Sequence, residues 1–479
     1  MVALSSKFNR RFGLGTASAA AQGIVPRYPV MGIAAVTVAT LLAVNLIPDH
    51  PDPEGALFWP ALVLTAGLLI APAAAALRQP KALLRAEHLL VMAPIYWLLL
   101  DLLQGAYSMA GIATSEIEYA FIAIGIFVAC LWLGSMGRPW RVPSLLRDSV
   151  SEDLPPTVYF YLVIASFLLG IAKFAVGSEF NLIEMFRSLG SGRWDAPWAR
   201  GQMGGWDAFL DHLQYFGYLT SVLTVVVGRK LGWRNWRTIV SAVLSLVMAM
   251  FLVQSGSRRV IGVVVGVALV FWILVQDKKL KVKHAFAAML TMVVLLLGMQ
   301  VMLQYRNVGL TAALSDPSLT DDDTPASEYL HVDDNFYRLC QVIQLIPSTH
   351  PYVYHGFVVY AVVRPIPRVL WPDKPVDAGF DLTRAVGDRE VSYSCSVIGE
   401  LYMSLGFFGI AIGGWLYGRF AALINGLLTQ SAGLGAVVIY SIGVMALFSG
   451  MRSMLELVLV SYVIVAWVVL SRLFRTQFQ

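Results

Sequence analysis

The stretch VIGVVVGVALVFWILV, residues 260–275, contains no charged side chain and no break in its apolar character. A helix needs about 20 mostly apolar residues to cross a bilayer, and this run with its flanks has that length. An unbroken run can satisfy its backbone hydrogen bonds in lipid only as a helix, whereas a barrel strand alternates apolar and polar residues. The stretch therefore predicts a transmembrane helix.

Similar runs recur along the whole chain of 479 residues, which is 57% hydrophobic and only 14% charged. They predict an all-α polytopic membrane protein with about twelve transmembrane helices. We expect the spans near residues 29–47, 57–77, 87–105, 117–136, 157–176, 206–227, 237–254, 259–276, 284–305, 396–418, 433–450 and 453–471.

Basic residues in the short loops predict the orientation of these spans. Loops on one side carry most of the lysines, and by the positive-inside bias this side is the cytoplasm. The N-terminal tail has basic residues but no apolar core, so we expect no cleaved signal peptide and both termini in the cytoplasm. The basic residues on this side are Lys7, Arg10, Arg11, Arg27, Arg78, Lys81, Arg85, Arg138, Arg141, Arg147, Arg229, Lys230, Arg234, Arg237, Lys278, Lys279, Lys281 and Lys283.

The spans divide the chain into four parts. Residues 1–28 form a cytoplasmic tail, and residues 29–305 hold helices one to nine with an outer loop at about 177–205. Residues 306–395 form a large outer loop with amphipathic, interfacial or re-entrant segments. Residues 396–479 hold the last three spans and a second cytoplasmic tail.

The outer segments contain arginine in place of lysine, apart from Lys173 and Lys374. A guanidinium keeps its charge and presents a planar fork that matches phosphate or carboxylate oxygens, so this preference indicates anion binding. The alternative is that these arginines pair with loop carboxylates and lipid headgroups. The outer arginines are Arg187, Arg193, Arg200, Arg258, Arg259, Arg306, Arg338, Arg364, Arg368, Arg384, Arg389 and Arg452.

Five ionisable residues lie near the outer ends of spans: Asp101, Asp211, His212, Glu400 and Glu456. Ionisable groups inside membranes are costly and usually line a wet cavity or face a partner, so their common level predicts a site that opens outward. Water reaching each residue at the interface is the alternative explanation. A transporter is expected to place such groups nearer the midplane.

The large outer loop contains one clear amphipathic helix, DDNFYRLCQVIQLIP, residues 333–347. We expect Asp333 or Asp334 to cap its start and Pro347 to stop it. Its apolar stripe consists of Phe336, Leu339, Cys340, Ile343 and Ile346.

The segment RPIPRVLWPDKP, residues 364–375, follows a short apolar stretch that is too interrupted to span. Its four prolines fix their own φ angles and favour extended neighbours, so Arg364, Arg368 and Lys374 are held on a stiff segment. Trp371 can anchor the segment at the membrane interface. Such a preorganised cationic strand suits a lipid-linked diphosphate, whose tail stays in the bilayer.

PIPRVLWPDKP, together with SVIGELYMSLGFFGIAIGG at the next span, resembles the C-terminal signature of the Wzy-type O-antigen and oligosaccharide repeat unit polymerases. SGSRR before residue 260 is similar to an arginine-bearing element of the same family. As motifs the resemblance covers about 255–260 and 364–414, and as architecture it covers most of the chain.

This resemblance implies an integral-membrane glycosyltransferase of the bacterial cytoplasmic membrane with its active site facing the periplasm. It implies that donor and acceptor are undecaprenyl-diphosphate-linked glycans, with a chain-length regulator and a flippase as further partners and no cofactor. Arginines suit the departing diphosphate, and we predict that Arg258, Arg259, Arg364 and Arg368 bind it, with Arg306 next.

The acceptor hydroxyl needs a base or a hydrogen-bond acceptor near the reacting carbon. Glu400 is the first candidate because it begins a span directly after the cationic segment, followed by His355 and Asp211. For Glu400 the alternative is an ion pair that fastens its helix to an arginine, and for His355 it is a bond to a loop carbonyl.

Other chemistries have weaker support. Acidic clusters at 49–54 and 321–323 could hold a divalent ion, but both lie in loops that water reaches anyway, and we predict no metal. Cys340 and Cys395 could form a disulfide. The net charge of +5 gives no reason to expect a nucleic-acid partner. The competing functions are an O-antigen-ligase-type transferase and a transporter or flippase for lipid-linked sugars.

Overall fold

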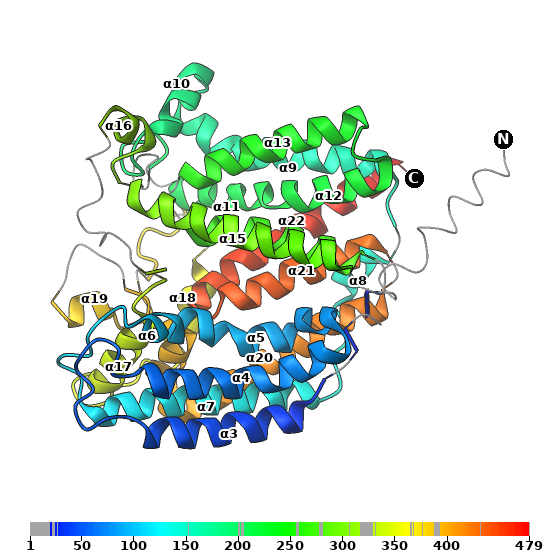
Figure 1. Cartoon of the computed structure of the whole chain (residues 1–479). Coiled ribbons are helices and arrows are strands. Elements are labelled where there is room, and N and C mark those ends of the chain that lie inside the picture. Colours follow the sequence, from blue (N-terminus) through cyan, green and yellow to red (C-terminus); the bar gives the residue numbers. More distant parts are fainter. Residues whose placement is uncertain are drawn as a thin grey trace.

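The computed structural model describes residues 20–21, 24–25, 27–151, 153–199, 202, 206–254, 258–276, 281–305, 307–316, 329–330, 332–364, 366, 368–375, 377–387, 393–431 and 433–478. These residues form helices and loops, with no strand among them. In Figure 1 the long helices run side by side along one direction.

All twelve predicted spans correspond to helical segments. The longer helices are α3 (Pro29–Asn45), α4 (Phe58–Arg78), α7 (Thr114–Met136), α9 (Pro156–Gly177), α11 (Asp207–Gly217), α12 (Leu219–Leu231), α13 (Trp236–Gln254), α14 (Arg258–Leu274), α15 (Val282–Tyr305), α20 (Ser396–Gln430), α21 (Leu434–Ser449) and α22 (Met454–Phe478). The third predicted span is divided into α5 (Ala86–Pro94), the π-helical turn η2 (Ile95–Leu99) and α6 (Leu100–Gln104).

The length and composition of these helices make the chain a polytopic helical membrane protein. Within the described residues, eight helices are long and apolar enough to cross a membrane, and α3 and α21 are shorter apolar helices. The eight are Phe58–Arg78, Ala86–Gln104, Thr114–Met136, Pro156–Gly177, Trp236–Gln254, Val282–Leu303, Ser396–Gln430 and Met454–Phe474.

The two ends of the bundle differ (Figure 1). At the left end of the view, which we call the loop end, are the short helices α10 (Leu182–Arg187), α16 (Leu310–Ser315), α17 (Asn335–Leu345), α18 (Gly356–Val363) and α19 (Leu382–Ala385). At the right end, which we call the tail end, are α8 (Ser144–Val150) and the C-terminus.

The amphipathic helix predicted at 333–347 is α17, and its predicted stripe is buried against the bundle. Phe336, Leu339, Cys340, Ile343 and Ile346 are all buried, and α17 packs on α7 and α20. Asp334 occupies the N-cap position, as predicted, but its side chain makes no capping hydrogen bond. Asp333 and Asp334 instead pair with arginines, which offer stronger charge-assisted bonds than a backbone N–H.

Helix α20 differs most from its predicted span, residues 396–418. It continues to Gln430 and bends sharply at Leu405 and Gly406, where Gly406 adopts a φ of 62°. A side chain at Gly409 or Gly413 would collide with Leu401, so the segment before the bend folds back along the segment after it. Glycine is favoured at this bend because it adopts positive φ without a steric penalty.

Candidate active site

A cavity of about 2440 Å³ is lined by residues of the loop end and by residues of the helices behind it. The described residues that line it include eight cationic side chains and nine carboxylates. The cations are Lys173, Arg193, Arg258, Arg259, Arg364, Arg368, Lys374 and Arg452. The carboxylates are Glu54, Asp207, Asp211, Asp333, Asp334, Asp377, Asp381, Glu400 and Glu456.

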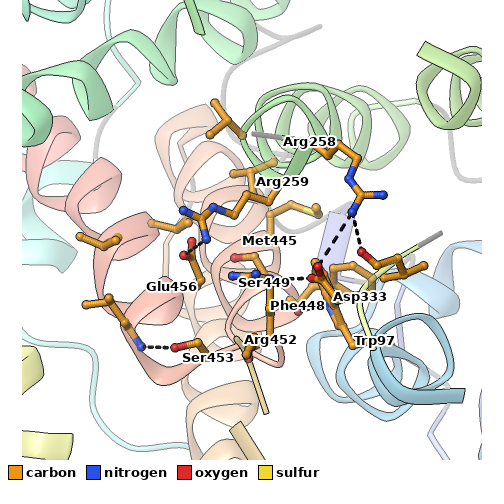
Figure 2. A pocket seen from close by; sticks show the side chains of 18 of the residues that line it. Trp97, Arg258, Arg259, Asp333, Met445, Phe448, Ser449, Arg452, Ser453 and Glu456 are labelled. Carbon is orange, nitrogen blue, oxygen red and sulfur yellow. Dashed lines mark hydrogen bonds and ion pairs between the residues drawn. The ribbon is translucent and has the colours of Figure 1, made fainter. Parts of the chain in front are cut away.

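Arg258 and Arg259 lie in the first turn of α14 and contact different segments of the chain. Arg258 donates from Nη2 to the carbonyl of Val332 at 2.6 Å and lies 3.9 Å from Asp333. Arg259 pairs through Nη1 with Glu456 at the start of α22. Figure 2 shows these pairs on the wall of the cavity. Because ordered partners hold each guanidinium, little side-chain entropy remains to be lost when an anion binds.

Arg452 is the third guanidinium of this group, and it lies in the turn between α21 and α22. Its Nε donates to Asp333 at 2.7 Å, so Asp333 is shared between Arg452 and Arg258. Burial alone would lower the pKa of Arg452, but Asp333 and Glu456 raise it above its ordinary value. Arg452 therefore keeps its positive charge inside the cavity wall. We call Arg258, Arg259 and Arg452 the arginine cluster.

Glu400, the first catalytic candidate, also lines the cavity, but both of its carboxylate oxygens hold the start of α22. Oε1 accepts from the Ser453 hydroxyl at 2.6 Å, and Oε2 accepts from the backbone N–H of Met454 at 2.5 Å. These two hydrogen bonds make Glu400 a helix cap for α22, and not the ion-pair partner that the alternative interpretation expects.

Two more bonds fasten the same turn to the beginning of α20. The N–H of Val397 donates to the carbonyl of Met451 at 3.0 Å, and the Ser394 hydroxyl donates to the carbonyl of Arg452 at 2.7 Å. Glu400 therefore belongs to a set of contacts that positions Arg452. This role is a positioning role, because the Glu400 carboxylate acts through the turn that carries Arg452.

The proline-rich segment brings two more arginines to the same cavity. Arg364 donates to the Tyr360 hydroxyl at 3.0 Å, and Arg368 donates to the carbonyl of Pro372 at 3.0 Å. Lys374 is buried and donates to the carbonyls of Arg364 and Ile366, at 3.0 and 2.5 Å. The Lys374 ammonium thus closes the segment on itself, while the two guanidiniums line the cavity.

Asp211, the third catalytic candidate, lines the cavity from α11. Its Oδ1 pairs with Lys173 at 2.7 Å, and its side chain is 37% exposed. Of the three catalytic candidates, Asp211 is the one whose carboxylate both lines the cavity and is accessible to solvent. His355 is exposed at the start of α18 and Trp371 is 38% exposed, and neither is among the residues that line the cavity.

The five ionisable residues predicted at one level are only partly brought together. Asp211, His212, Glu400 and Glu456 line the cavity. Asp101 is buried outside the lining and accepts from the N–H of Val332 at 3.3 Å. Its carboxylate therefore supports the backbone that Arg258 also contacts.

Some predicted residues lie outside the described part of the chain. These are Arg306, the prolines at 365 and 367, residues 255–257 of the SGSRR element and the acidic cluster at 321–323. Among the described residues, no group of three His, Cys, Asp or Glu side chains could hold a metal ion. Cys340 and Cys395 are both buried free thiols, so the structure does not contain the disulfide that the sequence allowed.

Sequence reasoning did not assign Arg452, Asp333 or Lys173 to the site. Arg452 carried a signal, since it is an arginine in a short turn between two apolar runs on the side where lysine is scarce. Asp333 carried none, because its adjacency to an amphipathic helix favoured a capping role. Its real partners are 75 and 119 residues away along the chain.

Comparison with models of known protein families, with curated proteins and with solved structures returns no match.

Proposed function

We propose that the chain is an integral-membrane glycosyltransferase that joins undecaprenyl-diphosphate-linked repeat units and releases undecaprenyl diphosphate. In this proposal twelve spans cross the bacterial cytoplasmic membrane and both termini are cytoplasmic. The loop end then faces the periplasm. The product is a cell-envelope polysaccharide such as O-antigen, capsule or exopolysaccharide.

One observation carries the proposal: six arginines from four separate segments line a single cavity at the loop end, and one of them is Arg193 from the segment before α11. Arg258 and Arg259 come from α14, Arg452 from the turn before α22, and Arg364 and Arg368 from the proline-rich segment. Several donors directed at one place are what a diphosphate with many oxygens requires.

The reaction assigns a chemical task to these side chains. A hydroxyl of the acceptor sugar attacks the anomeric carbon of the donor, a new C–O bond forms, and the bond between that carbon and the diphosphate breaks. The electron pair stays on undecaprenyl diphosphate, whose developing charge the guanidiniums stabilise. The hydroxyl proton passes to a carboxylate, and Asp211 is the proposed acceptor because both oxygens of Glu400 hold α22.

Carboxylates beside the arginines do not prevent anion binding. A guanidinium offers five N–H donors, and a bidentate ion pair uses two of them. In Arg259 and Arg452 the carboxylate partner fixes the orientation of the guanidinium fork, so a diphosphate can add further bonds to a prearranged group. The mixed lining also suits a substrate that has an anionic part and many hydroxyls.

The proposal is tested by Arg364→Lys and Arg368→Lys, with Arg384→Lys as the matched control. Arg384 also belongs to the loop end, but its side chain is 74% exposed and it does not line the cavity. We expect both test variants to insert normally and to lose polymer, because lysine keeps the charge but not the fork. The control should make polymer of wild-type length.

A deletion strain separates the competing functions. Accumulation of single-repeat lipid-linked oligosaccharide supports the polymerase. Finished polymer that remains on its carrier lipid indicates a ligase, and loss of every outward-facing intermediate indicates a flippase. Wild-type chain length in both arginine variants contradicts the proposed diphosphate site.

A further inference from the structure

Helix α15 is the least buried of the eight described helices that are long and apolar enough to cross a membrane. Only 11% of its apolar window is buried inside the protein, compared with 67% for α20. It packs against α14 near both ends, through the Trp272–His284 ring contact and through Met299, which lies beside Gly262. Its middle part is therefore left for other contacts.

The cavity continues along this middle part as an apolar groove. Its walls are Leu84 and Leu89 beside α5, Val270 and Ile273 on α14, and Met289 and Met292 on α15. From Val260 to Ile273, the α14 residues that line the cavity are all apolar or glycine. The arginine cluster thus lies at one end of a passage with hydrocarbon walls.

The length of the groove indicates which kind of hydrocarbon chain can fill it. Arg259 and Ile273 are fourteen residues apart on one helix, which places them about 21 Å apart along the axis. One leaflet of the hydrocarbon core is only about 15 Å thick. A chain that fills the groove from the arginine cluster inward therefore extends past the bilayer midplane, farther than a phospholipid acyl chain ordinarily lies.

We infer that the groove between α5, α14 and α15 binds the polyprenyl chain of the lipid-linked substrate, with its diphosphate at the arginine cluster. This inference rests on the proposed function. Charge complementarity at one end and apolar walls along the rest match a ligand with an anionic head and a long hydrocarbon chain. The other face of α15 is exposed at Val293, Val294 and Leu297 and meets membrane lipid.

Two positions on α15 provide a matched test. Met292 lines the groove and is 43% exposed, whereas Val294 does not line it and is 61% exposed. Being two residues apart, their side chains point about 200° apart around the helix. Met292→Trp fills the groove, and Val294→Trp adds the same bulk on the lipid side.

Binding is measured with the full chain in nanodiscs, using undecaprenyl diphosphate and the short-chain farnesyl diphosphate as probes. We expect Met292→Trp to weaken the binding of undecaprenyl diphosphate about 10-fold to 100-fold, because overpacking of a well-filled site costs about 1–3 kcal/mol. Farnesyl diphosphate should lose less affinity in Met292→Trp than undecaprenyl diphosphate does, because its shorter chain occupies less of the groove. Equal undecaprenyl diphosphate affinity in the two variants overturns the inference.

A photoreactive undecaprenyl diphosphate with a diazirine about 21 Å along the chain from the diphosphate, the length of the groove, then maps the chain. We expect labelling of α14 and α15 near Ile273 and Met289. Stronger labelling of these residues by a photoreactive phosphatidylglycerol overturns the inference, because the groove then holds ordinary lipid. If the prenyl probe labels the groove but purified protein forms no glycan polymer, the inference that the groove binds a prenyl chain is supported and the proposed reaction is contradicted.

Discussion

Several cations at the two ends of the bundle differ in their main partners. At the tail end, cations donate to backbone carbonyls: Lys81 to Leu274 and Gln276, Arg229 to Val275, and Arg419 to Gly134 and Arg138. At the loop end, the arginine cluster pairs with carboxylates on the wall of a cavity.

The difference follows from the unpaired backbone groups and the charges that are present at each end of the helices. The last carbonyls of a helix have no partner within the helix, and cations placed there complete their hydrogen bonds and favour the helix dipole. Lys81 and Arg229 close the end of α14 in this way. At the loop end, Arg258 and Arg259 lie at the start of α14, where their charge opposes the helix dipole and is balanced by Asp333 and Glu456. This position, unfavourable to the helix dipole, is consistent with the proposed anion site.

The largest expected effect is the loss of activity in Arg452→Lys. Removing one preorganised donor to a developing charge costs about 100-fold to 1000-fold in rate, and lysine cannot reproduce the Nε contact with Asp333. The measurement is the polymerisation rate of purified protein, with melting temperature as the control for folding. A rate within threefold of wild type would remove Arg452 from the site.

The second largest effect that we expect is a loss of stability when Arg419 at the tail end is replaced. Arg419 is buried, donates to two carbonyls and stacks near Trp140 and Trp415. Arg419→Met leaves those carbonyls without their donor, so we expect the protein to lose about 1–3 kcal/mol of stability. Activity per folded molecule should stay unchanged. Reduced turnover at normal stability would show that the tail end also acts in catalysis.

Glu400→Gln tests a residue that structure and sequence assign differently. A glutamine oxygen can accept from Ser453 or Met454 but not from both as a carboxylate does, so we expect a loss of about 0.5–2 kcal/mol, typical of a weakened cap. Turnover should fall only modestly, and the pH profile of turnover should keep its shape. A profile that loses its acidic limb in Glu400→Gln would restore Glu400 as the catalytic base, because a base must be deprotonated to act.

The sequence predicts some features of this molecule well and others not at all. Apolar runs of bilayer length predict the helices well, because lipid leaves the backbone no alternative. The bend at Gly406 was not predictable, since glycine among apolar residues is also typical of helix packing. The scarcity of outer lysine singled out arginines of which several line one cavity, but the pairing of Asp333 with Arg258 and Arg452 depends on how distant segments fold together.

The smallest expected effect concerns Lys374. Burial, with added repulsion from Arg364 and Arg368, lowers the pKa of Lys374. A lowered pKa means that the folded chain releases this proton at lower pH than the unfolded chain does. Stability attributable to Lys374 therefore rises as pH increases between the two pKa values. Lys374→Met should flatten this alkaline rise in melting temperature, and an unchanged rise would assign it to other groups.

The central claim is that the arginine cluster holds a diphosphate. A cryo-electron microscopy map of the full chain in nanodiscs with undecaprenyl diphosphate tests it most directly. We predict density for the two phosphates in contact with Arg258, Arg259 and Arg452 at the loop end. Clear diphosphate density elsewhere on the protein, with the three guanidiniums contacting only Asp333 and Glu456, would contradict the account.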